Sequence, residues 1–291
     1  MPIREMGERF IRVFPVRLIM AKIFSSPNAD STTITTFDGV KHDWEELIVK
    51  MYDDDFYYGY LGKQALSSSI IKTILKSPKE YQRYLNKEGD DDTQPLRDGK
   101  LFHWRVLEPD KFDDLNIVDV ASKNTKAYKE AVAEFGSVFT RKEVNMAIEL
   151  ADVLHNNKEA MELITDGDYE VPQMQMIDGV PIRGKADILL HDTQIIDLKT
   201  TADISTFRWS AKKYGYDLQA YLYLQLFPEA EKFTFLCIDK KTHDVGIFEC
   251  SDEFLQSGKE KLELGIKRYK DFFTVMNSQE VINQHIIRSI I

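Results

Sequence analysis

The chain has 291 residues, of which 43% are hydrophobic and 30% are charged, a composition typical of a soluble globular protein with a sizeable core. Its formal net charge of -10 disfavours a protein that coats nucleic acid passively, but it does not exclude an enzyme with a locally basic groove. Cysteine occurs only as Cys237 and Cys250, which excludes a four-thiolate metal site and a disulfide framework. We therefore expect a protein of a reducing, cytoplasmic compartment.

The first residues mix basic and apolar side chains and lack the compact apolar region of a secretory signal. No run of about 18 apolar residues predicts a membrane span. Met20 opens an ordinary start of its own, so a beginning at Met1 or at Met20 stays open. Residues 25–40 are polar and turn-rich and predict a loop. We assign residues 1–60 to an N-terminal arm of unknown role.

Helical patterns dominate the chain up to residue 168. A short amphipathic helix is predicted within residues 42–53, and a serine-capped helix with a Ser-Pro break within residues 67–84. An acidic loop follows at residues 86–94. Further helical patterns cover residues 95–107 and 123–165.

At residue 169 the pattern changes from helical to strand-like. Residues 169–177 alternate, Asp178-Gly179 is a two-residue hairpin signal, and the return strand covers residues 180–190. After a short turn at residues 191–193, the remaining elements are a strand at 194–199, helix to about 227, strands at 232–239 and 245–250, and a helix at 252–275. This order predicts an α/β fold, with a mixed sheet flanked by helices. We assign residues 61–291 to one domain, helical in 61–168 and with its catalytic sheet core in 169–275.

Two carboxylates lie near the ends of neighbouring predicted strands, Asp187 on the second and Asp197 on the third. The tight turn between these strands brings the two side chains close, and such a pair repels unless a cation lies between. Oxygen ligands of this kind suit magnesium, with manganese as a substitute. Lys199 follows two residues after Asp197 and so shares its face of the strand, where it can orient water and stabilise charge on a phosphoryl group.

The helix that follows places Gln219 and Tyr223 four residues apart, on one helical face. With Gly184 and Asp187, then Asp197, Lys199, Thr200 and Thr201, then Tyr214-Gly215-Tyr216, these residues resemble the motifs of the PD-(D/E)XK nuclease superfamily, and within it the RecE (exonuclease VIII) type of phage exonuclease, which is related to lambda exonuclease. The resemblance covers about residues 60–275. It implies that Asp187, Asp197, Lys199, Gln219 and Tyr223 are catalytic.

The resemblance implies further metal ligands. Residues 96–109 are similar to the family's Gly-x-x-x-His helix, which puts His103 in the metal shell beside Asp187 and Asp197. Glu170 occupies the place of an acidic residue on the family's first core strand, and the backbone carbonyl of Leu198 would also face the metal. For Glu170, a solvated strand position stays open as the alternative.

A nuclease must also hold a polyanion near its metal. Basic residues around the motifs, and a serine at a helix start whose amide and hydroxyl groups suit a terminal phosphate, are the candidates. These predicted DNA-binding residues are Arg97, Arg183, Lys185, Lys212, Lys213 and Ser68.

The resemblance implies a magnesium-dependent exonuclease that resects linear duplex DNA in the 5′ to 3′ direction for recombination or DNA degradation. It also implies a ring-shaped homo-oligomer and a single-strand annealing partner. Two alternatives stay open: a structure-specific endonuclease or flap nuclease of the same superfamily, and a catalytically silent DNA-binding or assembly module. Retention of Asp187, Asp197, Lys199 and Gln219 argues against the silent module.

Overall fold

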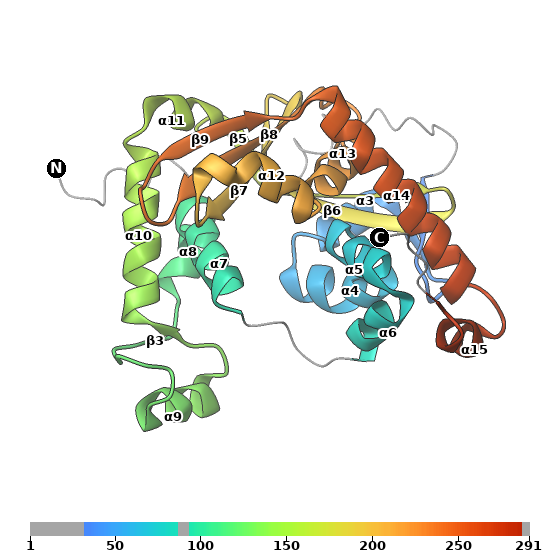
Figure 1. Ribbon diagram of the computed structural model, residues 1–291, viewed down its shortest axis with the longest axis horizontal. Coiled ribbons are helices and arrows are strands. Elements are labelled where there is room, and N and C mark those ends of the chain that lie inside the picture. Colours follow the sequence, from blue (N-terminus) through green and yellow to red (C-terminus); the bar gives the residue numbers. More distant parts are fainter. Residues whose placement is uncertain (1–31, 87–92, 287–291) are drawn as a thin grey trace.

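The computed structural model describes residues 32–86 and 93–286 of the chain (Figure 1). Residues 1–31, on which the choice between Met1 and Met20 depends, and residues 87–92 of the predicted acidic loop lie outside the described residues. Within the described ranges, no helix combines the length and the apolar character needed to cross a membrane.

The second half of the chain builds a five-stranded sheet with the strand order β5-β6-β7-β8-β9. Neighbouring strands are antiparallel, except that β7 and β8 are parallel. The predicted mixed sheet is therefore confirmed. Its strands are β5 (Gly167–Ile177), β6 (Val180–Leu190), β7 (Gln194–Thr201), β8 (Lys232–Asp239) and β9 (Val245–Glu249).

Helices interrupt and follow these strands. Between β7 and β8 lie η2 (Ile204–Thr206), α12 (Phe207–Lys213) and α13 (Tyr216–Leu226), and after β9 come α14 (Asp252–Phe273) and α15 (Ser278–Asn283). We predicted continuous helix up to residue 227, but Gly215 has a φ of 69° and separates α12 from α13. Glycine adopts this left-handed conformation without steric cost, so the chain can turn there.

The first half is mainly helical, as predicted. Its elements are α5 (Ser68–Lys76), α6 (Pro78–Asn86), α7 (Gln94–Leu107), α8 (Pro109–Asp113), β3 (Ile117–Val118), α9 (Lys126–Phe135), β4 (Phe139–Thr140), α10 (Arg141–His155) and α11 (Lys158–Ile164). Ser67 caps α5 as expected, because its hydroxyl accepts the Ile70 N–H. The helical pattern at 123–165 is three helices rather than one, since Gly136 at a φ of 73° ends α9 and Asn157 caps α11.

The predicted loop at 25–40 contains a strand in its described part. The first elements are β1 (Thr33–Thr35), β2 (Lys41–Asp43), α3 (Trp44–Lys50), the π-helix η1 (Asp55–Tyr60) and α4 (Leu61–Gln64). They enclose a small apolar cluster that includes Leu47, Met51 and Leu61 and also takes in Met174 of β5. Across the expected boundary at residue 60, η1 continues directly into α4. The described part of the predicted arm thus packs on the catalytic sheet.

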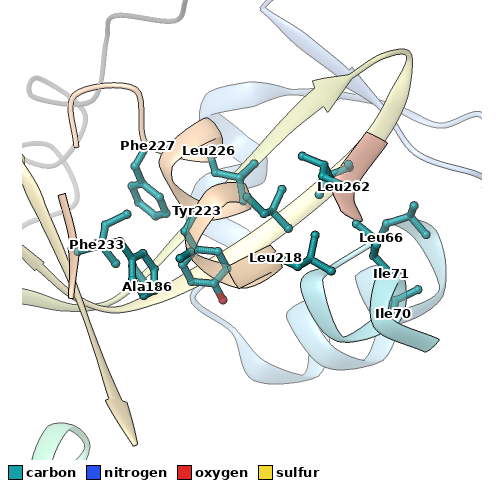
Figure 2. Packing of buried hydrophobic residues seen from close by; sticks show 14 of the residues in the cluster. Leu66, Ile70, Ile71, Ala186, Leu218, Tyr223, Leu226, Phe227, Phe233 and Leu262 are labelled. Carbon is teal, nitrogen blue, oxygen red and sulfur yellow. The ribbon is translucent and has the colours of Figure 1, made fainter. Parts of the chain in front are cut away.

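Two apolar clusters lie on opposite faces of the sheet. One face is covered by α5, α13 and α14, and Figure 2 shows its side chains from these helices and from β6 in contact. The other face carries Ile196 and Leu236 and is covered by α7, α10 and α11. Each fully buried Leu, Ile or Phe in such a cluster contributes about 1.5–3 kcal/mol. This packing holds the strand ends in fixed positions.

The strand β6 is irregular at Asp187. Ala186 belongs to the first cluster and Ile188 to the second, although residues two apart in a regular strand share one face. Pairing with β5 is also interrupted there, because Tyr169 pairs with Ile188 and Val171 with Ala186 while Glu170 and Asp187 do not pair. The candidate functional site lies at this interruption.

Candidate metal and catalytic centre

Glu170 and Asp187 lie directly opposite each other at the interruption of the β5–β6 hairpin. The hairpin turn fixes this register: Asp178 and Gly179 have φ values of 49° and 75°, as a type I′ turn requires. Glu170 has a φ of 52°, a left-handed backbone that is rare for glutamate. Such strain persists only where surrounding structure maintains it, and it is concentrated at functional sites.

The helix α7 adds a histidine to these two carboxylates. His103 Nε2 lies 2.6 Å from Glu170 Oε1, and His103 Nδ1 lies 3.5 Å from Asp187 Oδ2. One ligand atom from each of the three residues falls within 4.8 Å of the others. One nitrogen and two carboxylate oxygens in this arrangement fit a divalent cation.

Asp187 also joins β6 to β7 where these strands diverge. The last paired residues are Ile188 of β6 and Ile196 of β7, and beyond Ile196 the strand β7 no longer pairs with β6. Asp187 Oδ2 accepts the Leu198 N–H at 2.8 Å, which satisfies a backbone donor at the divergence. The predicted role of the Leu198 carbonyl as a metal ligand stays a prediction.

On the other side of the divergence, Asp197 forms a second polar cluster with Lys199 and Gln219. Asp197 is 1% exposed. Its Oδ1 accepts the Gln219 Nε2 donor at 2.6 Å, and its Oδ2 contacts Lys199 Nζ as an ion pair. Among the described residues, Oδ2 has no oriented hydrogen-bond donor. A buried carboxylate oxygen left in this state is also suited to a cation.

Burial and mutual charge perturb these groups strongly. Burial raises the pKa of Asp197 to about 6, helped by the charge of Asp187 and opposed by Lys199. For Lys199, burial disfavours the ammonium form, but the negative charges of Asp197 and Asp187 outweigh it and raise its pKa. Lys199 is therefore a cation at neutral pH, which suits it to orienting groups and stabilising negative charge.

The pKa of His103 is set by the same two effects, burial and the charge of its neighbours. Burial favours the neutral ring of His103, yet the adjacent Asp187 and Glu170 carboxylates raise its pKa well above the ordinary value. Burial in turn raises the pKa of Glu170. In the absence of a cation, the protonated ring thus holds the two carboxylates together. A metal ion would replace that proton as the neutralising charge.

Tyr223, predicted to be catalytic, lies in the core beside the site. Figure 2 shows its ring between Ala186, Phe233 and Leu226. Its hydroxyl accepts the backbone N–H of Lys185 at 3.4 Å. A Cβ on Gly184 would approach the Tyr223 ring to 2.9 Å, so the glycine makes room for it. These contacts give Tyr223 a role in holding β6 in place.

Both arginines predicted to bind DNA are used inside the protein instead. Arg97 is 4% exposed and its guanidinium donates to Glu143 at 2.7 and 3.0 Å, which leaves no path to a phosphate and corrects the prediction. Arg183 is also buried, where it donates to the Leu61 carbonyl at 3.2 Å and covers the Tyr57 ring.

The remaining predicted DNA-binding residues differ in position. Lys185 is only 8% exposed, and its Nζ lies 3.0 Å from Asp54 and 3.9 Å from Glu170 Oε2, next to the metal cluster. Lys212 and Lys213 are exposed at the end of α12. Ser68 is buried as the first residue of α5. Of this set, Lys212 and Lys213 stay available to an external phosphate, and Lys185 lies nearest the metal cluster.

Sequence reasoning missed two groups beside the site. Asp54, Tyr57 and Tyr58 come from the predicted arm, yet they surround Lys185. Lys72 of α5 reaches the other cluster, where burial and the charge of Lys199 lower its pKa to about 8. The run of acidic and aromatic residues at 53–60 was a visible signal, but nothing local connects it to Lys185.

Comparison with known proteins agrees with this geometry. Residues 67–281 match the family model described as "PDDEXK-like domain of unknown function (DUF3799)". The chain belongs to this family. The match spans both clusters and most of the described chain, so the predicted membership of the PD-(D/E)XK superfamily is confirmed. The RecE type within the superfamily stays a prediction.

Solved structures support the fold of this PDDEXK-like protein. A Eubacterium rectale protein named as a candidate exonuclease is similar, with a TM-score of 0.61 and 18% sequence identity over 82% of this chain and 95% of that one. An alkaline exonuclease from Laribacter hongkongensis is 12% identical over 71% of this chain and 88% of that one, and its TM-score of 0.34 is too low to carry weight. No curated protein sequence matches significantly.

Proposed function

We propose that this PDDEXK-like protein is a divalent-metal-dependent deoxyribonuclease that hydrolyses phosphodiester bonds of linear duplex DNA from an end. The observation that carries the proposal is the junction of two clusters on β6 and β7: the His103, Glu170 and Asp187 ligand set lies next to the charged Lys199. Phosphodiester hydrolysis needs both a cation and a positioned positive group.

Each residue has a task in this reaction. His103, Glu170 and Asp187 would hold the cation, and Asp197 would join them through Oδ2, which is paired with Lys199 in the absence of a cation. When bound, Mg²⁺ or Mn²⁺ makes a water a stronger nucleophile and offsets phosphoryl charge. Lys199 donates toward the reacting phosphate or water, and Gln219 holds Asp197 in the orientation that keeps Lys199 in place.

The finer assignments rest on the resemblance to RecE-type exonucleases. They are 5′ to 3′ digestion, a ring of identical subunits, and delivery of the exposed strand to a single-strand annealing protein during recombination in a bacterial or phage-infected cytosol. Lys212 and Lys213 would contact the DNA backbone.

A digestion assay tests the proposal. Linear duplex labelled at one end at a time is incubated with the full chain and Mg²⁺ or Mn²⁺, beside closed circular duplex of the same sequence. We expect stepwise shortening of the linear DNA, loss of activity with a chelator, and intact circles. Equal cutting of circles would favour an endonuclease, and no cutting with either metal would favour the silent module.

A further inference from the structure

An aromatic side chain lies exposed beside the metal cluster. Tyr58 is 60% exposed, although large aromatic side chains usually bury most of their surface. It belongs to the π-helix η1, a conformation that is rare and found mostly at functional sites. The proposed function gives Tyr58 no task.

Tyr58 is linked to the cluster through Lys185. The Lys185 ammonium lies 5.3 Å from the centre of the Tyr58 ring and 3.9 Å from Glu170 Oε2. Successive bases of a stacked strand are separated by roughly 3.4 Å, so the Tyr58 ring lies within about three nucleotides of the metal ligands. A base on this ring would therefore lie within a few nucleotides of the bond that the centre would cut.

Contacts around η1 hold the Tyr58 ring in place. Tyr57, which is buried, packs edge-on against it with ring centres 4.9 Å apart. Asp54, just before η1, binds Lys185 at 3.0 Å and also pairs with Lys111 of α8. Beyond η1, the Leu61 carbonyl accepts Arg183 at 3.2 Å. Tyr58 is thus a supported and mostly exposed ring with the Lys185 ammonium over it.

We propose that Tyr58 is a stacking platform for an unpaired nucleobase of the DNA strand that enters the metal centre. An exposed aromatic ring next to a cationic side chain is an arrangement by which proteins hold single-stranded DNA without sequence preference. Inside a duplex both faces of a base are covered by its neighbours, whereas an unpaired base at an opened end has a free face for Tyr58. The proposal rests on the proposed nuclease function and adds that the enzyme engages an opened end.

A thermodynamic cycle that combines a substitution in the protein with an abasic residue in the DNA tests whether a base stacks on Tyr58. The probes are a labelled duplex with a short unpaired tail and the same duplex with abasic residues at successive tail positions, bound to the full chain with Ca²⁺ in place of Mg²⁺. We expect Tyr58→Ala to weaken binding of the intact tail about 10-fold, and Tyr58→Phe, which keeps the ring, to bind like the wild type. An abasic residue at the stacked position should remove the difference between wild type and Tyr58→Ala.

The controls separate stacking from folding. Tyr84→Ala removes another exposed tyrosine, on α6 away from β5 and β6, and should leave binding unchanged. The wild-type protein alone should lose about 10-fold in affinity at one abasic position, a test that needs no variant. An equal loss for Tyr58→Ala on intact and abasic tails, or no abasic effect, would overturn the stack. If the protein hydrolyses DNA but the Tyr58 substitution and the abasic residue show no coupling, the stacking proposal fails and the nuclease proposal stays. If they show coupling but no DNA is hydrolysed, only the nuclease proposal fails.

Discussion

Helix α7 carries two buried charged clusters that differ in how they are neutralised. Near its start, Arg97 pairs with Glu143, whose carboxylate also receives Lys123 at 2.8 Å and the Thr140 N–H at 2.7 Å. Near its end, His103 meets two carboxylates, Glu170 and Asp187. The first cluster has more cations than anions and the second more anions than cations.

This difference shows how a structural cluster is distinguished from a reactive one. Burial disfavours ionised Glu143, but Arg97 and Lys123 outweigh it and lower its pKa, so that cluster needs nothing further. At the other cluster Glu170 keeps a raised pKa on a strained backbone. Buried charge alone does not identify a site; an excess of anions that only a cation can balance does.

The largest effect is expected at the charged pair beside the metal cluster. Asp197→Ala and Lys199→Ala should each lower the rate of hydrolysis at least about 1000-fold, because each removes a group that acts on the reacting phosphate or its cation. DNA binding should change little. The measurement is single-turnover cleavage of end-labelled duplex with anisotropy binding in parallel, and Lys241→Ala on an exposed turn is the control. Near-normal cleavage by either variant would refute the mechanism.

The Arg97–Glu143 cluster should govern stability instead. Arg97→Met leaves the Glu143 charge buried with fewer partners and should lower the free energy of unfolding by about 3–5 kcal/mol. Urea unfolding followed by circular dichroism measures this loss. Arg141→Met, at an exposed position of α10, should change it by less than about 0.5 kcal/mol. If Arg97→Met lowered cleavage per folded molecule while stability stayed unchanged, its assignment to structure would be wrong.

At the anion-rich cluster, a substitution should change metal affinity and leave stability nearly unchanged. Glu170→Gln keeps the shape and the hydrogen bond to His103 but removes one negative ligand, so Mn²⁺ affinity should fall at least about 10-fold. In metal-free buffer its unfolding should stay close to that of the wild type. Calorimetric titration with Mn²⁺ gives the affinity, and unchanged Mn²⁺ binding would exclude Glu170 from the ligand set.

Metal affinity should also depend on pH. Because its pKa is raised, His103 is protonated at neutral pH and must release that proton to bind a metal. Affinity should therefore rise about tenfold per pH unit below that pKa and level off above it. Titrations in two buffers of different ionisation enthalpy should show about one proton released, which His103→Asn should abolish. A pH-independent affinity would contradict this role.

The smallest effect is expected at the end of α12. Replacing Lys212 and Lys213 together by alanine removes two exposed charges at the end of α12. DNA binding should weaken a few-fold at low salt, and the slope of log affinity against log salt should fall by about 1–2. The cleavage rate at saturating DNA should not change. A salt slope equal to that of the wild type would place the DNA path elsewhere.

Much of the site was predictable from local spacing. Asp197 and Lys199 share a face because strand side chains alternate, and the ion pair between them follows. The Asp178-Gly179 turn pairs positions at equal distances along the hairpin, so the register that brings Glu170 opposite Asp187 was already present in the sequence. Interactions this close along the chain are constrained by backbone geometry alone.

Arg97 and Tyr58 show where such prediction stops. The sequence suggested DNA binding for Arg97 and no role for Tyr58, and only packing paired Arg97 with Glu143 and brought Tyr58 of the N-terminal segment beside Lys185. The sequence by itself determined the order of helices and strands along the chain, the hairpin register and the Asp197/Lys199 pair. Tertiary structure decided which buried charges are balanced, because the partners of a charge come from helices and strands far apart in the chain.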